Sequence, residues 1–246
     1  MTADSGRARR AAGGSEELRA LVARARHVLF DFDGPICLLF HGCPADRIAV
    51  EQVEWLDARG LGWMLTDAER RSPDPHGVLS SIAERHPGSD LVAELEEQLT
   101  RHELRAARLA RPTAYADVLV RTWVAVGVRL AIVTNNSART VSSYLHGRGL
   151  LRCFAPHIYG RTQDLSLLKP HPRTLNTALT ALGAAPEAAL MIGDSLSDHT
   201  AAVRAGVPFI GYARRAATAD RMRRAGVPEH SIMRSLAPLL EAVRPS

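Results

Sequence analysis

The sequence has few cysteines and no long apolar run, and both features exclude classes of protein. Its three cysteines, Cys37, Cys43 and Cys153, are odd in number and form no Cys-x-x-Cys pair, which argues against a disulfide framework and a structural zinc site. No charge-poor stretch reaches the roughly 18 residues of a membrane span. Residues 1–26 lack the apolar segment of a signal peptide. We therefore expect no membrane association and a reducing, cytoplasmic location.

Aromatic residues are also scarce, at 5% of the chain, although the formal net charge is +5. Basic residues are spread along the sequence and are concentrated only at 7–10 and 214–224. A nucleic-acid surface would need basic and aromatic residues gathered together. We interpret the charge as compositional and expect no nucleic-acid partner.

Lysine is the scarcest charged residue. Of 31 lysines and arginines, only Lys169 is a lysine. A general preference for arginine explains the others but not this exception, which stands in Leu168-Lys169-Pro170-His171-Pro172. Lys169 is therefore a candidate functional residue.

The stretch Val28–Pro35 joins an apolar, strand-forming run to two carboxylates one residue apart, and a Gly-Pro pair ends it. Asp31 and Asp33 would point the same way if the strand stayed regular, because side chains alternate along a strand. Open α/β sheets bind their ligands at the carboxyl ends of strands. On its own, however, the pair is equally consistent with a solvated turn.

The pattern along the chain predicts an α/β fold with a doubly wound, Rossmann-like parallel sheet and an inserted all-helical domain. Residues 37–111 look helical throughout, without a clear strand. From Pro112, which we place as the first residue of a helix, helices and strands alternate. We expect a disordered tail at 1–20, a core at 21–38 and 112–246, and the inserted helical domain at 39–111. The strands expected in the core are 28–33, 128–133, 157–159, 189–192 and 207–212.

Three of these strands end in polar clusters, and in a parallel sheet their ends share one edge. The clusters are Asp31 with Asp33, Thr134 with Asn135, and Asp194 with Asp198. Two carboxylates at ~4 Å repel by roughly 4 kcal/mol at an effective dielectric near 20, so a cation is needed. Oxygen ligands alone favour Mg²⁺.

Such an edge suits phosphoryl transfer. Lys169, Thr134 and backbone N–H groups would surround the phosphoryl oxygens with positive charge and donors. One aspartate can then act as nucleophile, while a second, for which Asp33 is suited, protonates the leaving alkoxide and later deprotonates water.

Four motifs occur in order along the chain, and together they resemble those of the haloacid dehalogenase superfamily. They are Asp31-Phe32-Asp33-Gly34, Thr134-Asn135, Lys169-Pro170 and Gly193-Asp194-Ser195-Leu196-Ser197-Asp198. The match covers residues 28–36 and about 112–212. The helical insertion between the first two motifs is similar to the family's C1-type cap, as in phosphoglycolate phosphatase-like members. Pro35 departs from the common Thr and removes an N–H there.

The resemblance implies a role for each motif. Asp31 would be the nucleophile and Asp33 the acid/base, while Lys169 would offset the charge of nucleophile and phosphate. The phosphoryl group would be bound by Thr134, Asn135 and Lys169, together with Phe32 and Asp33. Mg²⁺ would be held by Asp31, the Asp33 carbonyl, Asp194 and Asp198, although Asp198 could instead cap the helix that follows it.

These residues favour a Mg²⁺-dependent phosphatase acting on a small phosphorylated metabolite through an aspartyl-phosphate. A sugar phosphomutase would use the same residues with better exclusion of water. A non-catalytic ligand-binding protein would have little need for Asp33. His41 and Arg47, at the junction of core and cap, could reach the substrate or be solvated. The substrate and the oligomeric state stay open.

Overall fold

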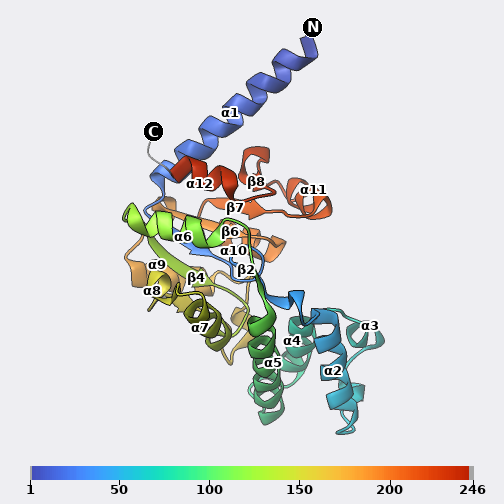
Figure 1. Cartoon of the computed structure of the whole chain (residues 1–246). Helices are drawn as coiled ribbons and strands as arrows, with labels where there is room; N and C mark the ends of the chain where they lie inside the picture. Colours follow the sequence, from blue (N-terminus) through green and yellow to red (C-terminus); the bar gives the residue numbers. More distant parts are fainter. Residues whose placement is uncertain (1, 244–246) are drawn as a thin grey trace.

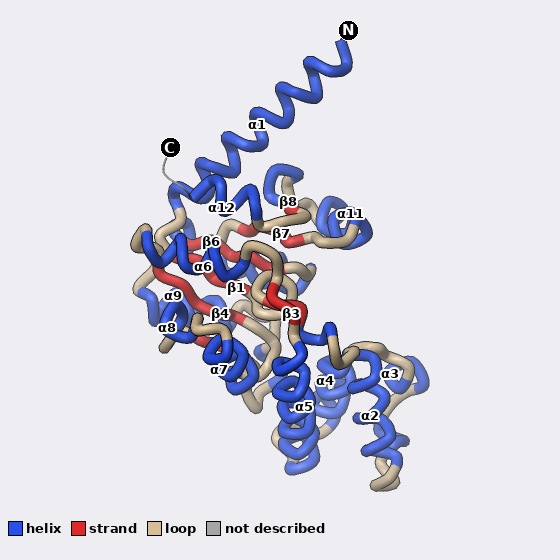
Figure 2. Tube along the Cα trace, in the orientation of Figure 1, coloured by secondary structure: helices blue, strands red, loops and turns tan. Residues whose placement is uncertain are grey.

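The computed structural model describes residues 2–243, with side chains from residue 13 onward. Its centre is a sheet of six parallel strands in the order β5-β4-β1-β6-β7-β8 (Figures 1 and 2). This order confirms the predicted α/β class with a doubly wound parallel sheet. The strands are β1 (His27–Phe30), β4 (Arg129–Val133), β5 (Ile158–Tyr159), β6 (Ala189–Gly193), β7 (Phe209–Tyr212) and β8 (Ile232–Met233).

Helices cover both faces of the sheet because successive strand residues point to opposite sides. Val28 and Phe30 of β1 join one buried cluster, and Leu29 between them joins the other. The first cluster is covered by α1 (Thr2–Arg24), α6 (Ala116–Ala125), α7 (Ala138–Gly147), α8 (Leu151–Phe154) and α12 (Ala237–Val243). The second is covered by α9 (Arg173–Leu182), α10 (Leu196–Ala205) and α11 (Ala216–Arg224).

A helical insertion extends from one end of the sheet (Figure 1). Its own apolar cluster includes Ile48, Leu79 and Leu95, so these helices pack on one another as well as on the rest of the chain. Both connections to it run through a short antiparallel pair, in which Cys37 faces Pro112 and Leu38 faces Arg111. The elements are β2 (Cys37–Leu38), α2 (Ala45–Asp57), α3 (Asp67–Arg70), α4 (Pro75–Arg85), α5 (Asp90–Leu109) and β3 (Arg111–Pro112).

This strand pair corrects two expectations. Residues 37–111 are not helical throughout, and Pro112 lies in β3 rather than at a helix start. Helix α6 begins only at Ala116, after Tyr115 adopts a left-handed conformation with φ of 70°. Two-residue strands carry no periodicity that a sequence pattern could reveal.

The N-terminal segment and the end of β1 also differ from expectation. Residues 2–20, expected to be disordered, belong to α1, whose Leu18 and Val22 are buried in the same cluster as Leu239 of α12. Strand β1 ends at Phe30, so Asp31 and Asp33 lie in the loop that follows rather than within a regular strand. Within residues 2–243, no helix combines the length and apolar character needed to cross a bilayer.

Candidate active site

The single lysine of the chain lies at the carboxyl end of the sheet, between two aspartates. Lys169 is 5% exposed, and its Nζ donates to Asp31 Oδ1 and to the Val133 carbonyl, each at 2.9 Å. A third hydrogen bond reaches Asp198 Oδ1. Burial alone would lower the pKa of Lys169, but the carboxylates of Asp198 and Asp31 raise it above its ordinary value. The side chain is therefore a fixed ammonium ion.

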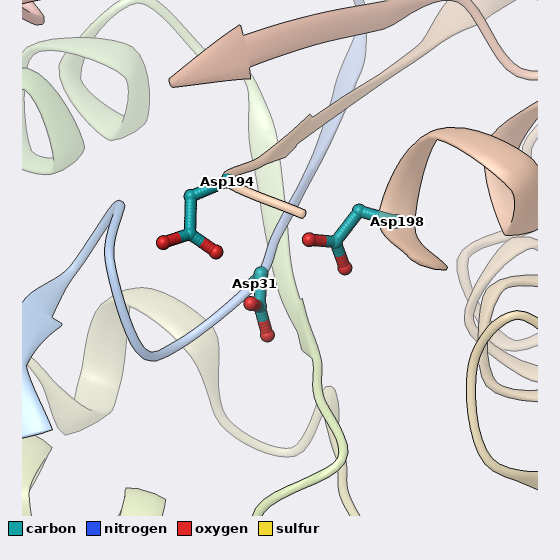
Figure 3. Close-up of side chains that lie close together, drawn as sticks. All are labelled: Asp31, Asp194 and Asp198. Carbon is teal, nitrogen blue, oxygen red and sulfur yellow. The ribbon is translucent and has the colours of Figure 1, made fainter. Parts of the chain in front are cut away.

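Three carboxylates gather beside this ammonium group. Asp31, Asp194 and Asp198 each offer an oxygen within 4.8 Å of the others, approaching from the ends of β1 and β6 and from the start of α10 (Figure 3). Burial and the charge of Asp198 raise the pKa of Asp31. Burial, followed by the charges of Asp31 and Asp198, raises the pKa of Asp194 well above its ordinary value. One lysine does not balance these charges, and a hard divalent cation such as Mg²⁺ fits the oxygen-only donor set.

Two glycines allow the strand ends to come this close. A Cβ atom on Gly34 would lie 2.4 Å from Asp194 Oδ2, and Gly34 has a φ of +103° that favours glycine. A Cβ atom on Gly193 would lie 2.4 Å from the Cβ of Asp198. Larger residues at either position would push the carboxylates apart.

Asp33 is separate from the carboxylate cluster and has a different environment. Its Oδ1 accepts a hydrogen bond of 2.8 Å from the Leu39 backbone N–H. Burial raises the pKa of Asp33 to about 6, even though this hydrogen bond lowers it. A carboxyl group with this pKa can both donate and accept a proton near neutral pH. Its carboxylate is not within the group that could hold a cation, so only its carbonyl remains as the ligand expected from the motif.

The expected phosphate-binding residues are near the site, but several of their side chains are already engaged. Thr134 is fully buried and its Oγ1 donates to Asn136 Oδ1 at 3.1 Å. Asn135 Nδ2 donates to the Lys169 carbonyl at 3.0 Å, and the Lys169 N–H donates to Asn135 Oδ1 at 2.8 Å. Asn135 thus holds the lysine loop in place. The ring of Phe32 packs edge-on against Tyr144 with centroids 5.4 Å apart, which leaves only its main chain for a ligand.

Both carboxylate oxygens of Asp198 accept hydrogen bonds from neighbouring residues. One oxygen accepts from Lys169, and the other accepts from the Ser195 N–H at 3.0 Å and its Oγ at 2.7 Å. Ser195 and Asp198 form a capping box at the start of α10. The alternative left open by the sequence, a helix-capping role, is therefore present in the structure, together with a contact that orients Lys169.

A buried ionic network that the sequence analysis missed joins the helical insertion to the strand ends. Glu103 of α5 is fully buried, and its Oε1 accepts from Arg161 Nη1 at 2.8 Å. Its Oε2 accepts from the Ser137 N–H at 2.9 Å, in the loop after β4. His76 Nε2 of α4 lies 3.2 Å from Glu103 Oε1, without the alignment of a hydrogen bond. Arg161 also donates to the Asn135 carbonyl at 3.0 Å.

The charges in this network reinforce one another. Burial would raise the pKa of Glu103, but His76 and Arg161 lower it to about 2. Burial would lower the pKa of His76, but Asp74 and Glu103 raise it to about 9. The sequence held one indication: Glu103 follows Leu95 and Leu99 at a spacing of four, on the buried face of its helix.

Two cavities meet at the carboxylates. The smaller, about 380 Å³, is lined by Asp31 and Lys169 and, from the insertion, by His76. The larger, about 760 Å³, shares Asp33 and Asp194 with it and extends toward β7 and α11. His41 lines the larger cavity. Arg47 lines neither of these two cavities and lies 3.5 Å from Glu51 at the surface.

Comparison with known proteins agrees with this geometry, because the sequence matches a family of hydrolases. Residues 83–212 match the haloacid dehalogenase-like hydrolase family. The chain belongs to this family. This haloacid dehalogenase-like hydrolase is 36% identical over 211 residues to a phosphoglycolate phosphatase of Rhodospirillum rubrum. The aligned region covers 76% of this chain and 80% of that protein. It is 31% identical over 186 residues to a phosphoglycolate phosphatase of Xylella fastidiosa, covering 74% and 78%.

Solved structures share the fold of this hydrolase. A mutant of CbbY from Rhodobacter sphaeroides, in complex with xylulose-(1,5)bisphosphate, matches with a TM-score of 0.65 at 21% identity, covering 90% of this chain and 100% of that one. A predicted phosphatase from Clostridium acetobutylicum also matches with a TM-score of 0.65, at 18% identity, covering 88% and 97%. The family match over residues 83–212 and the two phosphoglycolate phosphatases confirm the family assignment made from the four motifs, and the solved structures agree with its fold.

Proposed function

We propose that this hydrolase is a Mg²⁺-dependent phosphatase that cleaves a small phosphorylated metabolite through an aspartyl-phosphate on Asp31. The observation that carries the proposal is the position of Asp31, which contacts Lys169 on one side and lies beside Asp194 on the other. The relatives in Rhodospirillum rubrum and Xylella fastidiosa, named phosphoglycolate phosphatases, support a small substrate of this class.

In the first half-reaction, a carboxylate oxygen of Asp31 attacks phosphorus while the bond from phosphorus to the leaving oxygen breaks. Lys169 offsets the negative charge of nucleophile and phosphoryl group, because its ammonium is fixed by Asp198 and the Val133 carbonyl. Asp33, whose raised pKa keeps part of the population protonated near neutrality, gives its proton to the leaving alkoxide.

In the second half-reaction, water attacks the phosphorus of the acyl phosphate. Asp33, now deprotonated, takes a proton from this water, and the bond between Asp31 and phosphorus breaks. Inorganic phosphate leaves and both aspartates return to their starting states. The same carboxyl group thus acts first as acid and then as base.

The carboxylates of Asp31 and Asp194, with the Asp33 carbonyl, are the groups that would hold Mg²⁺. The ion, when bound, neutralises charge on the phosphoryl oxygens. We assign Asp198 to positioning Lys169 and capping α10, because protein donors occupy both of its oxygens.

We further propose that the insertion, predicted at 39–111, covers the site as a cap. His76 already lines the cavity that contains Asp31 and Lys169. The ionic network around Glu103 attaches the insertion directly to the loop after β4.

Phosphate release from p-nitrophenyl phosphate tests the proposal. We expect turnover that needs Mg²⁺ and stops with EDTA. Asp31→Asn should lower kcat by about 10³-fold or more, and Asp33→Asn by about 10²- to 10⁴-fold, with the fold preserved. Asp67→Asn, at an exposed position on α3, is the control and should retain full activity. Full activity in Asp31→Asn would exclude the covalent scheme, and release of an isomerised phosphate ester instead of inorganic phosphate would indicate a mutase.

A further inference from the structure

The larger cavity begins at the proposed proton donor and ends at a basic wall. Asp33 and Asp194 line its inner end. Arg214 and Arg215, in the loop after β7, and Arg221 on α11 line its outer part. The cavity is about 760 Å³, twice the roughly 380 Å³ of the neighbouring cavity that contains the nucleophile.

The arginines of this wall have no carboxylate partner among residues 13–243. Arg221 makes one long contact of 3.4 Å with the Thr218 hydroxyl. Arg223, two residues further along the same helix, contacts both Asp220 and Glu229 at 2.6 to 2.7 Å. Of these two arginines, Arg223, which does not line the cavity, is neutralised by ion pairs, whereas Arg221, which lines it, is available for an anion.

In the proposed mechanism, the leaving group extends from Asp33 toward these three arginines. The leaving oxygen must lie next to Asp33 to receive its proton, and it lies on the side of phosphorus opposite Asp31 because the attacking and leaving oxygens are roughly in line. Asp33 lines both cavities, whereas Asp31 lines only the smaller of the two. The carbon chain attached to that oxygen therefore starts at the inner end of the larger cavity. Its far end would approach the three guanidinium groups.

We propose that Arg214, Arg215 and Arg221 form a subsite for a second anionic group on the leaving-group side of the substrate. This inference rests on the proposed phosphatase function and narrows its substrates to phosphate esters whose alcohol carries a further phosphate or carboxylate. Guanidinium groups suit both anions because they can donate paired hydrogen bonds to two oxygens. The exposed position of the arginines makes the attraction sensitive to salt.

Three matched esters separate the possible second groups. Each has a three-carbon chain with phosphate at one end, and the other end carries a phosphate, a carboxylate or a hydroxyl. Binding is measured by calorimetry with Asp31→Asn, which removes turnover, and kcat/KM is measured with Asp31 intact. The binding arm tests the subsite even if no ester is hydrolysed, so failure of the subsite and failure of the phosphatase proposal give different results.

We expect at least one anionic ester to bind about tenfold or more tightly than the hydroxyl ester, as one charge-assisted contact would give. The combined variant Arg214→Gln, Arg215→Gln, Arg221→Gln should remove this preference while leaving the hydroxyl ester unchanged. Whichever anionic ester benefits more identifies the second group. Arg223→Gln, on the same helix but paired, is the matched control and should keep the preference.

In the protein with all three arginines, the preference for the anionic ester over the hydroxyl ester should also shrink as the salt concentration rises from 50 to 500 mM. In the combined variant, the relative binding of the esters should not depend on salt. Equal binding of all three esters would overturn the inference. A preference that survives in the combined variant, or an equal loss for the hydroxyl ester, would overturn it as well. Arg214→Gln, Arg215→Gln and Arg221→Gln are also measured singly. Each should lower the preference in part, which distinguishes loss of the subsite from a folding defect in the combined variant.

Discussion

Replacing Glu103 by glutamine removes a buried negative charge from the junction between the insertion and the sheet, at nearly constant volume. The side chains of Glu103 and Arg161 are both fully buried, with 2.8 Å between Oε1 and Nη1. Removing one partner of a buried ion pair costs about 3–5 kcal/mol, because the other charge is left without compensation. In the variant, Arg161 would still have the partly exposed Glu96 at 3.0 Å as a partner. We therefore expect a loss of stability at the lower end of this range, about 3 kcal/mol.

Helix α5 supplies its own control. Glu97 also reaches across to the sheet domain, where its Oε2 lies 2.6 Å from Arg139 Nη1, but both side chains are exposed. Exposed pairs contribute about 0–1 kcal/mol, so Glu97→Gln should change stability little. Urea unfolding followed by circular dichroism at pH 6 compares the two variants. With a slope of about 1–3 kcal/mol per M, Glu103→Gln should lower the midpoint by roughly 1–3 M.

The effect should depend on pH in a defined way. The pKa of Glu103 is lowered to about 2, so its stabilisation is complete above the ordinary carboxyl value and is lost as pH falls toward 2. The pKa of His76 is raised to about 9, so its stabilisation is complete below about 6.5 and is lost as pH rises through 9. The difference between wild type and Glu103→Gln should be largest between about pH 4.5 and 6.5.

Two results would refute this reasoning. One is a Glu103→Gln protein within 1 kcal/mol of Glu97→Gln at pH 6. The other is a difference from wild type that stays constant between pH 5 and 10, since His76 would then not depend on the charge of Glu103.

Two further predictions concern the catalytic loop. Gly34→Ala should lower the free energy of unfolding by about 1–2 kcal/mol through its positive φ, and it should raise the Mg²⁺ concentration for half-maximal activity, because the added Cβ would meet Asp194 at 2.4 Å. Denaturation and a Mg²⁺ titration measure the two effects, and an unchanged titration would contradict the second. If Asp33, with its pKa raised to about 6, is the acid, kcat/KM for an alkyl phosphate should fall as pH rises above 6, whereas p-nitrophenyl phosphate should respond less. Identical pH profiles for the two esters would contradict that role.

The sequence was sufficient to predict the convergence of Asp31 and Asp194, whereas Lys169, which follows no strand, was expected beside them because it is the only lysine and stands in one of the four motifs. The reason is that carboxyl ends of parallel strands must share one edge, and buried apolar runs identify those strands directly. The same rule placed Thr134 and Asn135 there, but it could not say that their side chains would bond to Asn136 and to the Lys169 backbone.

What the sequence did not reveal depends on long-range partners. Glu103 becomes a buried ion only because Arg161, 58 residues later, lies against it. The basic residues at 214–224 looked compositional, since nothing in a linear pattern indicates which arginines share a cavity with Asp33. The pairing of β2 with β3 joins Cys37 to Pro112, 75 positions later, through two short segments without periodicity.

The solitary lysine has a practical consequence for handling this enzyme. Amine-reactive dyes and cross-linkers need an uncharged, accessible amino group, and Lys169 is 5% exposed and held in its protonated form by two carboxylates. Such reagents should therefore leave Lys169 unmodified in the folded protein. Labelling of Lys169 would then report that the site had opened.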